Sequence, residues 1–140
     1  MDSELLDEFN SVLRSKDFDS INELSDSELS DIQVSIKNKF KVDVNRVWCW
    51  DSIGVQSKTV EYGEKDGLIE IKNFFGGDIN VKIVVTDEET PPWFGFKGKL
   101  FDILDVLRNV RYTEFFLIND NCSWIIFDTH HNSLVFAEEE

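Results

Sequence analysis

Apolar positions recur at helical spacing in two stretches near the start of the chain. They predict a first amphipathic helix over residues 3–14, with Ser3 as a candidate N-cap, and a second helix over residues 27–40. Ser25 lies three residues before Glu28, which is the spacing of a capping box. The apolar positions of the two helices are Leu5, Leu6, Phe9, Val12 and Leu13, then Leu29, Ile32, Ile36 and Phe40.

The pattern changes after residue 42. Residues 67–75 and 79–85, separated by two glycines and an aspartate, predict a β-hairpin with one buried face. Residues 86–92 are acidic, show no periodicity and end in two prolines, so we expect a loop. An apolar stripe over residues 100–110 predicts a third helix packed on a sheet.

The last third of the chain predicts three antiparallel strands in a meander, at residues 113–118, 123–127 and 133–136. The order of elements indicates an α+β fold: an antiparallel sheet of five or six strands with two N-terminal helices and one further helix packed on one face. We expect the strand that begins at Trp124 to be central, with a buried ring. Residues 1–140 are the size of a single domain.

The charge of the chain is strongly negative. Twenty-eight Asp and Glu against fourteen Lys and Arg give a formal net charge of −14 on 140 residues. Such a surface repels phosphate and anionic lipid, so the long-range field favours a basic protein partner and disfavours direct binding to nucleic acid or a membrane. The same charge also serves plain solubility. No leader-like start and no long apolar run are present, so we expect a cytoplasmic protein.

Residues that could carry chemistry are few. His130 and His131 invite a metal site, but neighbouring side chains of a strand point to opposite faces. A turn between two strands explains the pair better, so we expect no metal there. Cys122, His131 and Asp128 have the residue types of a nucleophilic triad, which recur by chance in many chains. The segment around Gly95 lacks the spacing of a phosphate loop. Since the sequence shows no recognisable catalytic signature either, we expect no cofactor and no catalytic residue.

The two cysteines, Cys49 and Cys122, are expected to be reduced thiols, since a single pair without an export signal gives little support to a disulfide. Trp48 and Trp50 stand at alternate positions and are expected on one face of a strand, in the core or at its rim.

The residues predicted to bind a partner are Asp87, Glu88, Glu89 and Trp93. Two prolines limit the loss of conformational entropy when this segment docks, while the acids steer a basic partner and the ring supplies an anchor. The alternative is an ordinary solvated acidic loop. In that case the acidic helical surface of residues 2–31 is the next candidate interface.

Residues from about 46 to 137 resemble a family of small bacterial proteins of unknown function. The likeness rests on Trp48-x-Trp50, residues 92–94, residues 114–118, and Trp124 followed by His130-His131-Asn132. The chain also looks like immunity proteins of bacterial toxin systems in type, being small, acidic and without catalytic motifs. That second resemblance implies a partner that is the basic, nucleic-acid-cleaving domain of a toxin.

We therefore expect a non-enzymatic immunity protein that covers the basic active-site region of a toxin, with a nuclease as the expected class. Two alternatives stay open. One is a small metal-dependent hydrolase centred on His130 and His131, and the other is an adaptor subunit of a larger complex.

Overall fold

The computed structural model describes residues 3–16, 21–45, 49–64, 66–87, 92–110, 113–129 and 133–139. The helices in these ranges are α1 (Ser3–Lys16), α2 (Asp26–Phe40), α3 (Gly67–Phe75) and α4 (Leu100–Asn109), with a 3-10 helix at Cys49–Ser52. The strands are β1 (Asn22–Glu23), β2 (Ser57–Glu61), β3 (Asn80–Val85), β4 (Phe94–Lys99), β5 (Phe115–Ile118), β6 (Trp124–Asp128) and β7 (Ser133–Glu138).

All of these strands form one sheet in the order β1-β4-β3-β5-β6-β7-β2, and every neighbouring pair is antiparallel. The predicted meander is confirmed, because β5, β6 and β7 are consecutive neighbours. β5 occupies the middle of the sheet, and its four side chains are all buried. β6 is an interior strand, one place from the middle.

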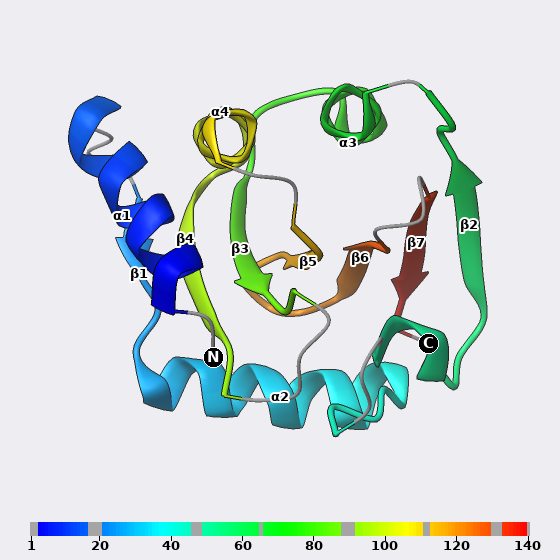
Figure 1. Ribbon diagram of the computed structural model, residues 1–140. Helices are drawn as coiled ribbons and strands as arrows, with labels where there is room; N and C mark the ends of the chain where they lie inside the picture. The colour runs from blue at the N-terminus through cyan, green and yellow to red at the C-terminus, as the bar shows by residue number, and fades with distance from the viewer. Residues whose placement is uncertain are drawn as a thin grey trace.

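Helices cover both faces of the sheet (Figure 1). On one face α1, α3 and α4 pack over strand residues that include Ile83, Phe115 and Leu117. On the other face α2 packs over a second set that includes Phe116 and Phe127. The α+β class is confirmed, whereas the expectation of helices on one face was wrong. The continuous apolar run of β5 requires two buried faces, since strands enclosed on both sides are apolar at every position.

α2 begins and ends where its sequence signals place it. The Ser25 hydroxyl accepts a hydrogen bond from the Glu28 N–H, and the Glu28 carboxylate accepts one from the Ser25 N–H, each at 3.1 Å. Beyond the last turn, Lys41 adopts a left-handed conformation with φ 58°. The predicted capping box is therefore confirmed, and the helix buries Leu29, Ile32, Ile36 and Phe40 on one stripe.

Residues 67–75 form helix α3, so the predicted hairpin between 67–75 and 79–85 was wrong. Asp66 caps the helix by accepting hydrogen bonds from the backbone N–H groups of Leu68 and Ile69, and Gly76 ends it with φ 67°. An N-cap at the start and a glycine at the end favour a helix even where the apolar residues between them also fit a strand. Residues 79–85 do form a strand, β3, and it pairs with β4 and β5.

The sheet has seven strands among the described residues, more than the five or six expected. The additions include β1 and β4, which pair with each other, and β2 at the opposite edge. Trp50 lies in the 3-10 helix and not in a strand, and Trp48 lies outside the described residues. The ring of Trp124 is half-buried at the start of β6, which corrects the expectation of a buried ring.

Gly95 permits the close approach of β3 and of Leu24, the residue after β1, to β4. A Cβ atom at this position would lie 2.3 Å from the carbonyl oxygen of Ile83 in β3 and 2.9 Å from the side chain of Leu24. The Gly95 carbonyl oxygen also accepts a hydrogen bond from the Leu24 N–H at 2.9 Å. A backbone oxygen cannot move aside as a side chain can, so only glycine fits at this position of β4.

We expect Gly95→Ala to lower the free energy of unfolding by about 1–3 kcal/mol, because the added methyl group overpacks the contact with β3. Urea denaturation followed by circular dichroism measures this loss. Gly77→Ala is the matched control, since a Cβ atom at Gly77 meets no atom within 4 Å. Equal midpoints for the two variants would contradict the proposed role of Gly95.

The stability of the fold in acid depends on the carboxylate of Glu28. Hydrogen bonding from Lys97, followed by the backbone hydrogen bond from Ser25, lowers the pKa of Glu28 from 4.5 to about 2. A depressed folded-state pKa means that the stabilisation is complete above the unfolded-state value and is lost as the pH falls from about 4.5 toward about 2.

Glu28→Gln keeps the hydrogen-bonding shape and removes the charge. Its deficit in unfolding free energy relative to the wild type should be largest near neutral pH and should shrink as the pH falls toward 2. Denaturation curves across this pH range test the prediction, with Asp31→Asn as the control for removal of an exposed carboxylate. A deficit that stays constant with pH would refute it.

Candidate functional site

The buried polar side chains of the described residues gather at one end of the sheet. β3 and β6 end there, while β5 and β7 begin there, and the register aligns Val85 with Phe115 and Phe115 with Asp128. These buried polar side chains are Thr86, Thr113, Glu114, Asp128 and Thr129. Buried polar groups need hydrogen-bond partners, so this end of the sheet forms a polar layer in which each of these side chains is hydrogen-bonded.

Glu114 is the centre of the polar layer on the face covered by α2. Its side chain accepts hydrogen bonds from the indole N–H of Trp50 at 3.2 Å and from the Thr86 hydroxyl at 3.1 Å. Its backbone oxygen accepts the N–H groups of Thr86 and Asp87 at 3.1 and 3.0 Å. Glu114 thus joins β5, the end of β3 and the 3-10 helix through one side chain and one carbonyl.

Asp128 holds the corresponding position on the opposite face. Its carboxylate accepts a hydrogen bond from the Tyr62 hydroxyl at 3.1 Å, and Tyr62 belongs to the core beneath α3 and α4. Next to it, Thr129 bonds to Ser133 through both its N–H and its hydroxyl, each reaching the Ser133 carbonyl at 3.1 Å. Because Glu114 and Asp128 lie on different faces, they do not form a pair of catalytic carboxylates around one cavity.

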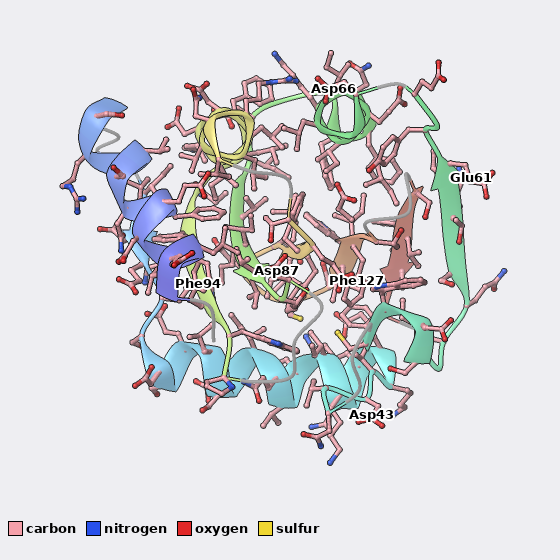
Figure 2. The ribbon with its side chains drawn as sticks, in the orientation of Figure 1. Asp43, Glu61, Asp66, Asp87, Phe94 and Phe127 are labelled. Carbon is pink, nitrogen blue, oxygen red and sulfur yellow. The ribbon has the colours of Figure 1, made fainter. Side chains whose placement is uncertain are left out.

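The predicted partner-binding segment begins at this end of the sheet. Asp87 follows β3 (Figure 2) and has φ 43°. Its carboxylate accepts a hydrogen bond from the Thr113 hydroxyl at 3.0 Å. Trp93 is 4% exposed, and its ring packs edge-on against Phe116 at 5.8 Å between centroids. Glu88 and Glu89 lie outside the described residues. The structure therefore brings Asp87 and Trp93 to one region, with the carboxylate near the surface and the ring in the core.

A second acidic surface includes the end of β1, the first half of α2 and the turn between β5 and β6. We call it the acidic face and define it by Glu23, Asp26, Asp31 and Asp120, which are exposed and make no ion pair with any other residue that the structure describes. Asp31 and Asp120 line a groove of about 180 Å³ between α2 and the sheet. The groove also contains Lys82, the cation among its lining residues, and Glu28, which pairs with Lys97.

The cysteine side chains are free and buried. Burial, followed by the negative charge of Glu114, raises the pKa of Cys49 to about 12, and burial likewise raises the pKa of Cys122. A thiol with a raised pKa holds little of the nucleophilic thiolate at neutral pH. Cys122 belongs to the core beneath α2, whereas Asp128 bonds to Tyr62 on the other face, so these two members of the considered triad are not brought together.

His130 and His131 lie outside the described residues, and the metal-site hypothesis that rests on them stays a hypothesis. In the described ranges, no group of three or more His, Cys, Asp or Glu side chains could hold a metal ion. None of the helices seen in those same ranges is long and apolar enough to cross a membrane.

The sequence interpretation missed Glu114 as a structural centre. One signal was available, because Glu114 directly precedes four consecutive apolar residues that are typical of a strand buried on both faces. A carboxylate at the entrance of such a strand must enter the core with partners or leave the sheet. The partner Trp50 is 64 residues away in the chain, and no local pattern identifies it.

We expect Trp50→Phe to reduce the free energy of unfolding by about 1.5–3 kcal/mol, since it removes a hydrogen bond to a buried carboxylate. Chemical denaturation at pH 7 measures the change. Trp124→Phe is the matched control, because it alters the same side chain at a half-buried site where the indole N–H has no hydrogen bond to a described residue. If the control loses as much stability, the hydrogen bond to Glu114 is not the cause.

No curated protein and no solved structure was found to match this chain. A family model matches residues 3–140, which is nearly the whole chain and more than the region of resemblance seen in the sequence. The description of that model is "Family of unknown function (DUF6756)". The small, acidic, two-faced α+β chain described above therefore belongs to the DUF6756 family.

Proposed function

We propose that this protein binds a basic protein partner, and that it is an immunity protein which neutralises a cognate bacterial toxin by covering its active-site region. A nuclease is the proposed toxin class. The observation that carries the proposal is the acidic face, whose four carboxylates lack ion-pair partners among the described residues on a chain of net charge −14.

Uncompensated carboxylates act on a partner before contact. Their field reaches about one Debye length, roughly 10 Å at 0.1 M salt, and it accelerates the encounter with a surface of opposite sign. A nuclease presents cations that hold the phosphate backbone of its substrate. Carboxylates of an inhibitor compete for those same cations, so electrostatic steering and inhibition follow from a single contact.

The acidic face is also rigid. The capping box fixes the start of α2, and the Lys97–Glu28 ion pair at 2.9 Å ties this end of the helix to β4. At the other end the Lys39 ammonium group donates to the Asn121 carbonyl oxygen at 2.7 Å, which ties α2 to the turn that carries Asp120. A rigid surface loses little conformational entropy on docking, so more of the interaction energy appears as affinity.

The loop acids Asp87, Glu88 and Glu89 remain in the proposal as a second group that steers the partner. The role of Trp93 changes. Its ring is buried against Phe116, so we assign it to the core beneath α2 and not to anchoring the partner. An adaptor subunit would use the same acidic surfaces, and the nature of the partner separates it from an immunity protein.

The proposal is tested on the genes that flank this one. We expect one of them to encode a basic domain that stops the growth of a bacterial host when it is expressed alone. Co-expression of the present chain should restore growth, and the two chains should co-purify at a one-to-one ratio. If no flanking gene product is toxic, or if toxicity persists on co-expression, the immunity proposal is wrong.

Charge reversal then locates the contact. Asp26→Lys with Asp31→Lys should slow association with the purified toxin domain by about tenfold at low salt and flatten its salt dependence. Asp7→Lys with Asp43→Lys changes the net charge by the same amount at exposed sites that belong neither to the acidic face nor to the lining of the cleft described below. Stopped-flow association rates compare the two, and an equal slowing by both double variants would contradict the assignment to the acidic face.

A further inference from the structure

A cleft of about 250 Å³ opens between α3 and the edge of the sheet formed by β6, β7 and β2. In Figure 1, α3 lies above these strands, and β2 is the outermost strand on this side of the sheet. The floor and walls are mostly apolar, and one carboxylate and one amide complete them. The residues that line it are Val60, Glu70, Asn73, Phe74, Ile126, Leu134 and Phe136.

Two aromatic rings form one wall of the cleft. The rings of Phe74 and Phe136 lie 4.8 Å apart between centroids at an interplanar angle of 52°. Phe74 is 43% exposed, whereas Phe136 is half-buried. Large exposed aromatic side chains beside a cleft are characteristic of surfaces that bind a partner.

Glu70 supplies the charge. It projects from α3 into the same cleft, is half-buried, and makes no ion pair with any residue in the described ranges. Lys72, two residues further along α3, is occupied elsewhere, because its ammonium group lies 4.7 Å from the centroid of the Phe101 ring. The negative charge inside the cleft is thus available to a cation from outside.

The volume indicates the size of the occupant. Pockets for drug-sized ligands and cofactors measure about 300–1,000 Å³, so a cleft of about 250 Å³ suits a single large side chain better. The apolar floor suits the methylene stem of a long basic side chain, and the rings allow a flat cation to stack on them. The Glu70 carboxylate then pairs with the positive charge of that side chain. The guanidinium group is planar, weakly hydrated and stacks on aromatic faces, which favours arginine over lysine.

We propose that this cleft receives an arginine side chain of the basic partner, as a docking site separate from the acidic face. The inference rests on the proposed function for the identity of the partner, while the chemistry of the cleft stands on its own residues. A second copy of this chain is a poor occupant, because it carries the same net charge of −14 and would be repelled.

The first test uses an isolated probe and needs no partner. N-acetyl-arginine methylamide should shift the methyl NMR signals of Val60, Ile126 and Leu134 at millimolar concentrations. The citrulline analogue, which has the same shape without the charge, should bind about fivefold or more weakly. Absence of these shifts, or equal binding of the two probes, would overturn the proposal.

Variants of the wall identify the groups that recognise the probe. Glu70→Gln and Phe74→Leu should each weaken binding of the arginine probe by about threefold to fivefold. Glu64→Gln removes a neighbouring exposed carboxylate that does not line the cleft, so it should leave binding unchanged. Equal weakening by Glu64→Gln would show general attraction by the acidic surface and would overturn the site.

The partner, once identified, gives the second test. Glu70→Gln should weaken the complex, whereas Glu64→Gln should not, and replacement of one arginine on the partner should remove that difference. If the complex forms with equal affinity for both variants, the cleft proposal fails while the proposed function stands. If the probe binds in the cleft but no toxin is found, the proposed function fails and the arginine site stands.

Discussion

The burial of β5 on both faces is the constraint on which the rest of the molecule depends. Phe115 and Leu117 enter the core beneath α1, α3 and α4, while Phe116 and Ile118 enter the core beneath α2. A strand that is apolar at every position leaves no face for solvent, so both helical layers are required. Outside partners therefore meet the helices, the strand ends and the sheet edges, and these are the places where the acidic face, Asp87 and the cleft lie.

Elements with a complete local signal could be predicted from the sequence. In α2 the apolar positions recur every three to four residues and a capping box precedes them, and in α4 the apolar positions form a continuous stripe. Local interactions and burial in the core therefore favour the same structure in both helices. The three C-terminal strands were equally consistent, because Asn- and Asp-containing turns separate three apolar runs. For α3 the apolar residues alternated as in a strand, and the cap at Asp66 and the glycine at Gly76 carried the decisive information.

Features made by distant residues could not be predicted. Glu114 and Trp50 meet only after β5 and the 3-10 helix are in place, and the cleft needs α3, which the sequence interpretation had assigned to a strand. Trp93 shows the opposite case, since a ring beside two prolines and several acids suggested an exposed anchor, yet the start of β4 carries it into the core. Aromatic character alone does not distinguish a binding residue from a core residue.

The two edges of the sheet differ in what they allow the protein to do. β1 has two residues and offers almost no template for another strand, whereas β2 has five residues and pairs only with β7 among the described strands. Lys58 and Glu61 are exposed along β2, and charged side chains on an edge oppose the addition of identical strands. Among the described strands, β2 is therefore the longer template for growth of the sheet into an aggregate, and its charged side chains oppose that growth.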